Sequence, residues 1–480
     1  MQLKKYILII SVLVLTIEAQ AQTQKVKARS RYFTATQSMS NAPTFGSKFV
    51  EGDILINLFD SSFYTCQKTG TFTQNWNKIG TLGSTGGGGG GNTYNYNISG
   101  NGLYISPDSC GAVHAATTFA AAGKNQTYID SIYPGIGATT TDMIDWAAWQ
   151  KAINIASATG LPVWCYGNYF VNKPITIAKT SLNIVVYGNN CLLTTTNNNR
   201  FAVFYRPTPT DNTEANTMVE AKYVFRNVNI SGGPSQCGFD VGPGYGQWFE
   251  GCHLTGLAKG IWLKFGLNTM VQNCYALACD SGFIADYGNW PGASTSNSQS
   301  NHTKFYGCQI HTSDTAAVGF GVYAASGVQI NSCIIEGDAV INGIDFDGKN
   351  ATVVKDFTVT GTHFECAQGA TNAFIKIRIR EGIATINTVF GQYPAVLVDA
   401  GSSSGDVFVH LENVVGWVAN GSGKAINNAG GVNYILENNA SILINKAGIP
   451  ALFSGTAVSE CTSAGCGLNK WYWKGLPSFQ

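Results

Sequence analysis

The sequence predicts an all-β chain folded as a right-handed parallel β-helix solenoid, with an N-terminal capping helix and a small N-terminal β module. Three observations predict it: a corner motif at coil-length intervals, an alternating strand after each corner, and a composition with 56 Gly and only 12% charged residues. Many turns and few helix formers favour strands. Because the core of a solenoid grows along one axis, one domain can take up most of the 480 residues.

The corner motif begins with a large apolar residue, has Gly, Asn or Ser at its third position, and has Cys, Val or Thr at its fourth. Its starts are 22 to 34 residues apart, at Phe225, Phe249, Val271, Phe305, Ile330 and Val359. A sharp corner often requires a residue with positive φ, which Gly and Asn adopt at low cost. The motif therefore predicts corners at Gly251, Asn273, Gly307 and Gly361.

The position after each corner residue should point inward and stack from coil to coil. We expect a buried column of free thiols there, formed by Cys252, Cys274, Cys308 and Cys333. Of the 13 cysteines, Cys461 and Cys466 in the C-terminal tail are the pair most suited to a disulfide in an exported protein.

Composition changes along the chain predict five segments. These are a signal peptide at 1–21, a small tail-fibre-like β module at 22–82, a Gly-rich linker at 83–104, the β-helix at 105–450 with its capping helix at 142–158, and a C-terminal cap or tail at 451–480. The apolar run from Tyr6 to Ile17 is short for a membrane span, although an uncleaved anchor is the alternative. The capping helix has Thr141 or Asp142 as its expected N-cap and ends at Gly160. The mature protein is therefore expected to be secreted, extracellular or at the cell surface, with no membrane span after cleavage.

Residues 105–450 resemble the pectate lyase superfamily of β-helices, which includes glycoside hydrolase family 28-like proteins and bacteriophage tailspikes. The resemblance lies in the 142–177 segment, with its helix, Gly-x-Tyr strand and Pro-led strand, and in the corner motifs. It implies a polysaccharide or a cell-surface glycan as partner, and tailspike-like outward apolar positions such as Ile284 leave a homotrimer open. The catalytic Asn-Thr-Asp, paired-Asp and Gly-His-Gly motifs of polygalacturonases do not occur in the sequence, so no catalytic residue is carried over from that family. The net charge of +1 offers no basic field for nucleic acid.

A first candidate site lies on the Gly-led strands, whose outward residues should form two columns. One column is Asp240, Trp262, Ile284, Tyr323, Asp345 and Lys376, and its neighbour is Lys264, Asp286, Asp347 and Arg378. Trp262 and Tyr323 suit sugar stacking, with Asp286 as a further substrate contact. Asp345 and Asp347 can hold Ca²⁺ as its metal ligands, and Lys376 or Arg378 can act as a base, which is the chemistry of a uronate lyase. The alternative is a ladder of cross-strand ion pairs.

A second candidate site lies three residues beyond each corner, where His311, Glu336 and Glu365 should occupy consecutive coils. The carboxyl groups of Glu336 and Glu365 on adjacent coils would lie near the separation of roughly 5–5.5 Å that is typical of a retaining glycosidase. His311 would then be a substrate contact. Asp314 and Asp338 lie near them in sequence. The alternative is a set of independent solvated turn residues.

The sequence therefore predicts an extracellular polysaccharide-binding β-helix that is a lyase or a glycoside hydrolase if it is active. The alternative function is a non-catalytic adhesin or a phage-type receptor-binding tailspike. The first candidate site is slightly preferred at this point, because a polymer can extend across several coils on a flat strand face.

Overall fold

The chain divides into two compact units, residues 1–96 and 97–480. In this computed structural model the structure describes residues 102–294, 297–312, 317–323, 325–337, 340–347, 355–366, 373–378 and 382–387, together with the strands named below outside those ranges. Several predicted features lie outside the described residues. They are the signal peptide, the glycine run, Asp314, Asp338, Cys461 and Cys466.

The first unit contains a four-stranded sheet in the order β1-β2-β3-β4. Its strands are β1 (Tyr32–Ala35), β2 (Ile54–Asn57), β3 (Ser62–Thr69) and β4 (Thr73–Thr81). β1 and β2 are parallel, whereas the β2–β3 and β3–β4 pairs are antiparallel. The strand β5 (Tyr96–Ser99) follows at the boundary between the units.

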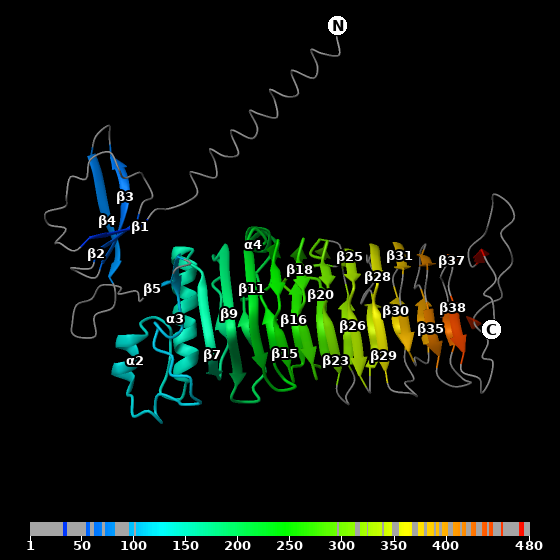
Figure 1. The fold of residues 1–480 in the computed structure, drawn as a ribbon, viewed down its shortest axis with the longest axis horizontal. Coiled ribbons are helices and arrows are strands. Elements are labelled where there is room, and N and C mark those ends of the chain that lie inside the picture. The colour runs from blue at the N-terminus through cyan, green and yellow to red at the C-terminus, as the bar shows by residue number, and fades with distance from the viewer. Residues whose placement is uncertain are drawn as a thin grey trace, which may run out of the picture. The chain divides into compact units, whose positions relative to one another are not determined.

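The second unit is a stack of coils in which each strand pairs in parallel with its counterpart in the next coil (Figure 1). Face 1 is an eleven-stranded sheet. Its strands are β8 (Ile175–Thr176), β10 (Ala202–Tyr205), β12 (Cys237–Asp240), β16 (Lys259–Lys264), β20 (Ser281–Asp286), β24 (Ala317–Val322), β27 (Val340–Asp347), β30 (Ala373–Arg378), β33 (Val396–Gly401), β36 (Lys424–Asn428) and β39 (Phe453–Ser454).

Two further faces complete most coils. Face 2 consists of β6 (Gly102–Ile105), β7 (Val163–Val171), β9 (Asn183–Thr195), β11 (Lys222–Ser231), β14 (Trp248–Glu250), β18 (Met270–Gln272), β22 (Lys304–Tyr306), β25 (Ala325–Asn331), β28 (Lys355–Thr360), β31 (Gly382–Asn387), β34 (Val407–Glu412), β37 (Tyr434–Asn438) and β40 (Lys470–Lys474). Face 3 consists of β15 (His253–Thr255), β19 (Tyr275–Leu277), β23 (Gln309–Thr312), β26 (Ile334–Gly337), β29 (His363–Cys366), β32 (Phe390–Gln392), β35 (Val415–Val418) and β38 (Ser441–Ile444). Short strands β13 (Gly244–Tyr245), β17 (Gly266–Leu267) and β21 (Ser300–Asn301) lie between faces 1 and 2 along the chain.

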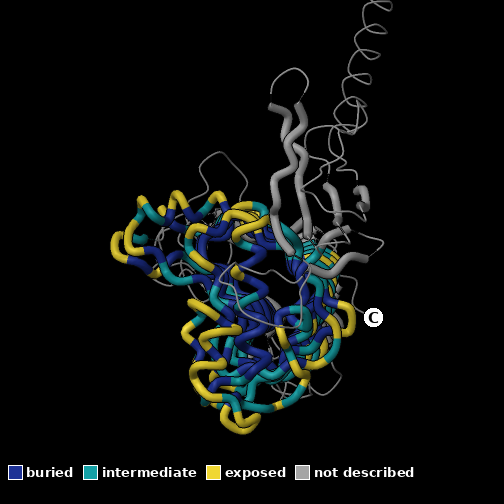
Figure 2. The backbone as a smooth tube through the Cα atoms, turned by 90° about the vertical axis from the view of Figure 1, so that its left-hand side faces the viewer, coloured by how far each residue is buried: buried dark blue, intermediate teal, exposed yellow. Residues whose placement is uncertain are grey.

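Apolar residues from all three faces are buried inside the coils. Figure 2 shows the buried positions along the backbone in dark blue. Phe225 and Phe249 stack at a centroid distance of 5.6 Å on face 2, and Phe239 of face 1 contacts both rings. Buried and outward residues alternate along β11 of face 2, as a sheet with one buried side requires. This architecture confirms the predicted all-β parallel β-helix.

The corner motif takes the conformation that its residue types predict. The angle φ is 62° at Gly251, 51° at Asn273, 61° at Gly307 and 59° at Gly361. Ser332 takes the same position in the intervening coil with φ at 53°. The corners join face 2 to face 3. Gly251, for example, lies between β14 of face 2 and β15 of face 3.

The glycines that begin the face 1 strands have a different role. A Cβ atom at Gly260 would lie 2.5 Å from the carbonyl oxygen of Gly282 in the next coil, and one at Gly282 would lie 2.8 Å from that of Gly319. Since real Cβ atoms do not approach a backbone that closely, glycine is required for the coils to stack at this position.

Replacing Gly307 with Val is expected to destabilise the protein by about 2–4 kcal/mol, because a β-branched residue fits positive φ poorly. Any Cβ at this position would lie 2.5 Å from Oδ1 of Asn273, so this contact is common to every substitution here and the positive φ distinguishes them. Thermal unfolding followed by circular dichroism measures this loss. Gly307→Asn is the matched control and should be much milder, because asparagine occupies the equivalent corner at Asn273. Equal stability of the Val and Asn variants would contradict the corner assignment.

Four corner cysteines form the predicted inward column. Cys252, Cys274, Cys308 and Cys333 are buried and free. Burial raises the pKa of Cys274 and Cys308 well above the ordinary thiol value. We therefore expect these thiols to resist an alkylating reagent in the native protein and to react after unfolding, with peptide mass mapping as the readout. Rapid native labelling of Cys308 would contradict the inward column.

The capping helix is α3 (Ile144–Thr159), and it ends at Gly160 with φ at 72°, as expected from the sequence. The predicted N-cap is wrong. Met143 is the N-cap residue and makes no side-chain capping bond. The Asp142 carboxylate instead accepts hydrogen bonds from the backbone and hydroxyl of Thr139 and pairs with Lys173 at 2.7 Å. Two short helices, α2 (Gln126–Ile132) and α4 (Asn212–Met218), complete the described helices.

Candidate functional site

The outward side of face 3 carries the second predicted site. Ile310, Ile335 and Phe364 of β23, β26 and β29 point into the core and are buried, so their neighbours in sequence point outward. The observed pairing puts His311 beside Glu336 and Glu336 beside Glu365. The predicted register of these three residues is therefore correct. Strand spacing separates the two glutamates by roughly 4.8 Å at the backbone.

Both glutamate side chains reach solvent, but their surroundings differ. Glu336 is the less exposed, with 31% of its side chain accessible, and its Oε2 lies 3.7 Å from Nδ1 of His311. The amide of Gln309 also donates to that oxygen at 3.4 Å. Glu365 is 51% accessible, and its Oε2 lies 3.5 Å from Nε2 of His363. Glu336 is thus held by two neighbours, whereas Glu365 is freer to move.

Polar and aromatic side chains extend this surface along face 3. His253 and Tyr275 occupy consecutive strands, with ring centroids 5.6 Å apart, and Gln309 follows Tyr275 in the same column. Burial, with a smaller contribution from the negative charge of Glu336, raises the pKa of Tyr275. Its phenol therefore stays protonated at neutral pH and can donate a hydrogen bond to a ligand.

On face 1, the pairing of Asp345 with Lys376 and of Asp347 with Arg378 agrees with the predicted register. Oδ1 of Asp345 forms an ion pair with Nζ of Lys376 at 3.5 Å. Asp345 is buried, whereas the Lys376 side chain is one-quarter accessible. The side chains of Asp347 and Arg378 lie outside the described part of the chain.

Trp262 lies among charged groups on the same face. The Nζ atoms of Lys259 and Lys264 lie 3.2 and 3.7 Å from its ring centroid. Two ammonium groups that close to one centroid would nearly touch if they shared a ring face, so we infer that the lysines occupy opposite faces. The indole Nε1 donates to Asp286 at 3.3 Å, and Lys264 pairs with buried Asp240 at 2.6 Å. A sugar ring would have to displace a lysine to stack on Trp262.

Tyr323 does not lie in the predicted column. Ile284 of β20 pairs with Gly321, and Gly321 pairs with Asp345, so the column contains Gly321 in place of the tyrosine. The reason is that Gly319, rather than Gly321, takes the close-packed position opposite the next coil. Tyr323 is only 8% exposed, and its ring atoms lie 2.9 Å from the place that a Cβ on Gly321 would take. Ile284 is only 2% exposed, so it does not offer the apolar surface considered for a trimer.

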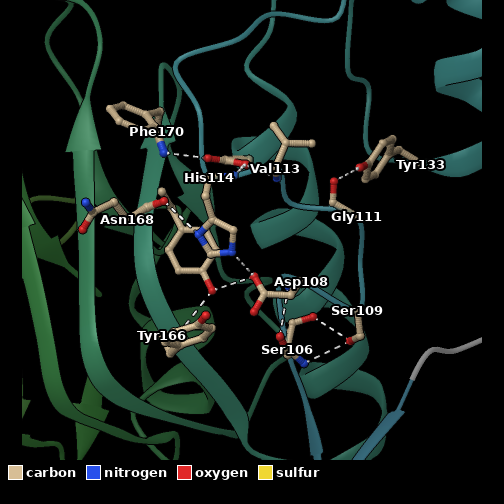
Figure 3. Close-up of polar contacts among 12 residues, drawn as sticks. Ser106, Asp108, Ser109, Gly111, Val113, His114, Tyr133, Tyr166, Asn168 and Phe170 are labelled. Carbon is tan, nitrogen blue, oxygen red and sulfur yellow. Dashed lines mark hydrogen bonds and ion pairs between the residues drawn. The ribbon is translucent and has the colours of Figure 1, made fainter. Parts of the chain in front are cut away.

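The sequence reasoning missed a cluster of polar contacts around the N-terminal cap (Figure 3). The His114 ring lies between Asp108 and the carbonyl of Asn168, at 2.8 Å from Nε2 to Oδ1 and 3.0 Å from Nδ1 to the carbonyl oxygen. The hydroxyl of Tyr169 donates to the same Asp108 oxygen at 2.9 Å. Both ring nitrogens therefore face protein acceptors, which suits a structural clamp better than a catalytic base.

Asp145 on α3 is the centre of the same cluster. One of its oxygens accepts from the backbone N–H groups of Val113 and His114 at 2.7 and 3.1 Å, and the other accepts from that of Phe170 at 3.0 Å. Burial raises the pKa of Asp145, while the three backbone donors oppose that rise. The signal that could have found this residue is an aspartate within the first turn of the helix that is not the N-cap.

Among the described residues, no group of three or more His, Cys, Asp or Glu side chains is arranged to hold a metal ion. Asp345 supplies one carboxylate toward the predicted Ca²⁺ site, but Lys376 neutralises it. The second ligand of that prediction, Asp347, has no described side chain. Ca²⁺ binding at this pair therefore stays a prediction.

Comparison with known proteins agrees with the observed fold. Residues 185–364 match the family described as the right-handed β-helix region. Curated protein sequences give no match. The chain is thus a right-handed parallel β-helix protein, as its resemblance to the pectate lyase superfamily implied. In the described part of the chain, no helix has the length and apolar character needed to cross a membrane.

Solved structures with similarity to the chain have low identity to it. The catalytic unit of a GH87 α-1,3-glucanase from Streptomyces thermodiastaticus is 13% identical, with 78% of this chain and 69% of that chain covered and a TM-score of 0.47. A mannuronan C-5 epimerase A-module from Azotobacter vinelandii is 13% identical over 74% of this chain and 99% of its own, with a TM-score of 0.44. The tailspike protein of an Acinetobacter phage is 10% identical over 94% and 77%, also with a TM-score of 0.44.

Proposed function

We propose that the protein is an extracellular polysaccharide-binding β-helix that hydrolyses its glycan at Glu336 and Glu365. The observation that carries this proposal is the pairing of the two glutamates on consecutive strands with both side chains open to solvent. Strand spacing of roughly 4.8 Å is close to the separation of about 5–5.5 Å between the carboxyl groups of retaining glycosidases. A polymer lying along face 3 would meet both groups.

The surroundings of the two glutamates suggest different roles. Glu336, held by Gln309 and His311, suits the nucleophile, whose carboxylate must keep its position during attack on the anomeric carbon. Glu365 suits the acid, which protonates the departing glycosidic oxygen and then takes a proton from the water that releases the sugar. Tyr275 and His363 are placed to contact neighbouring hydroxyl groups.

β-Elimination at the first candidate site is the second candidate function, because Asp345 and Lys376 form a register-matched acid–base pair. Its weakness is burial. A carboxylate that is inaccessible and already paired with a lysine is poorly placed to bind Ca²⁺ against a substrate uronate. This burial reverses the slight preference for the first candidate site that the sequence suggested.

Incubation of the wild-type protein with a panel of polysaccharides distinguishes these functions. Hydrolysis should generate new reducing ends without near-ultraviolet absorbance, and a calcium chelator should not reduce the rate. Unsaturated, ultraviolet-absorbing product that disappears with chelator would move the chemistry to Asp345. Binding without any cleavage would instead support a non-catalytic adhesin or a receptor-binding tailspike. The export signal predicted at 1–21 would fit all three functions.

A further inference from the structure

A second surface with features of a glycan site lies on face 2, away from the glutamate pair. Its side chains are Tyr104, Trp164, Tyr187, Arg226 and Trp248, on β6, β7, β9, β11 and β14. Their sequence neighbours Ile105, Val163, Val186, Phe225 and Phe249 are buried in the core. The five side chains therefore project outward, and we call them the aromatic stripe.

Members of the stripe contact one another from coil to coil. Ring centroids of Tyr104 and Trp164 are 5.8 Å apart, and those of Trp164 and Tyr187 are 5.7 Å apart. The interplanar angles are 47° and 46°, so neighbouring rings do not cover one another face to face. All three rings are partly exposed. Ring surface thus remains open to solvent along several consecutive coils.

Arg226 continues the stripe between two aromatic rings. Its guanidinium carbon lies 4.3 Å from the Trp248 ring centroid and 5.9 Å from that of Tyr187. Nε of the same side chain pairs with Glu250 at 2.8 Å, which neutralises the charge. A guanidinium has five N–H donors in one plane. The terminal nitrogens can therefore donate to hydroxyl groups of a ligand while Nε stays paired with Glu250. Together with Glu250, the stripe therefore carries aromatic surface and hydrogen-bond donors with no net charge.

We propose that the aromatic stripe binds a neutral polysaccharide whose chain runs along the stack of coils. Five consecutive strands span roughly 19 Å, a length that several sugar rings fill. Aromatic rings offer their faces to sugar C–H groups, Arg226 and Glu250 offer donors and acceptors to hydroxyls, and the lack of net charge favours a neutral glycan over an acidic one. The ligand class rests on the proposed function, but the stripe binds without cleaving and uses none of the residues of the glutamate pair.

Affinity electrophoresis in native gels tests this proposal with laminarin, xyloglucan and dextran as neutral probes and polygalacturonate as the acidic probe. Trp164→Leu and Trp248→Leu keep an apolar side chain at each position but remove the aromatic face. Each is expected to weaken retardation by a neutral probe at least about tenfold, with the double variant unretarded. Tyr128→Leu on α2, another partly exposed aromatic, should bind like wild type.

Several results would overturn the proposal. The ligand class is wrong if the wild-type protein is not retarded in gels that contain any of the three neutral probes. It is also wrong if the protein binds only polygalacturonate. Leucine variants that bind as wild type does contradict the site. A loss of binding that is accompanied by unfolding in circular dichroism, or by a change of oligomeric state in sedimentation, shows a structural or self-association role for the stripe. Failure of the proposed hydrolysis is a separate outcome, because it is measured by a cleavage assay and not by retardation in gels. It would be shown by a Glu336→Gln variant that cleaves the glycan at the wild-type rate.

Discussion

Replacing Glu336 with Gln is expected to lower the rate of glycan cleavage by about 10³-fold while leaving glycan binding nearly unchanged. Glutamine has the shape of glutamate but cannot attack the anomeric carbon as a carboxylate does. Glu365→Gln should lower the rate by about 10²–10⁴-fold, because it removes the proton donor for the leaving group. Initial rates of reducing-end formation, measured at saturating and at limiting glycan concentration, separate an effect on kcat from one on KM.

The matched control is Asp345→Asn on face 1. This variant breaks the pair with Lys376, so it is expected to lower stability without a specific effect on cleavage. If Asp345→Asn abolishes cleavage in folded protein while Glu336→Gln and Glu365→Gln remain fully active, the site is on face 1. If all three variants keep full activity, both candidate sites are wrong.

Replacing Asp145 with Ala is expected to have the largest effect on stability, a loss of about 3–5 kcal/mol. The substitution leaves the N–H groups of Val113, His114 and Phe170, whose hydrogen bonds are partly buried, without their acceptor, and each such donor costs roughly 1–3 kcal/mol, with less than full additivity. These groups tie α3 to the segment before it and to β7. Thermal unfolding measures the total loss, and hydrogen exchange at residues 108–170 locates it.

Two substitutions control this prediction. Asp145→Asn keeps one carbonyl acceptor and should be destabilised less than Asp145→Ala. Asp130→Ala removes an exposed carboxylate on α2 that accepts only from Gln126 among the described hydrogen bonds, and it should change stability by less than about 0.5 kcal/mol. An Asp145→Ala variant as stable as Asp130→Ala would show that the three hydrogen bonds do not hold the cap together.

The fold could be predicted because the β-helix repeats its physical requirements in the sequence. Every coil needs a corner with positive φ and a small inward residue, so Gly251, Asn273 and Gly307 are followed by cysteines of nearly equal burial. The same periodicity placed Glu336 beside Glu365 and Asp345 beside Lys376 without any structural information. Residues whose position follows from strand pairing were therefore within reach of the sequence.

Features that depend on contacts across the coil were not within reach. Tyr323 was misplaced because two glycines two residues apart, Gly319 and Gly321, both suit the start of a strand, and only the packing against Gly343 distinguishes them. The burial of Asp345 could not be read from an alternating pattern that makes it an outward residue. The aromatic stripe was missed because its contacts, such as Trp164 with Tyr187 and Arg226 with Trp248, join residues that are distant in sequence and meet only through coil stacking.

Covalent trapping tests the assignment of the glutamate pair most directly. The probe is a 2-deoxy-2-fluoro glycosyl fluoride of the sugar that the protein cleaves, since the fluorine slows release of a glycosyl-enzyme intermediate. Peptide mass mapping of the trapped protein is expected to find the sugar on Glu336, with Glu365→Gln forming the same adduct. An adduct on Asp345 or on any carboxylate outside face 3, or inversion of the anomeric centre in the first-formed product, would contradict a retaining hydrolase at Glu336 and Glu365.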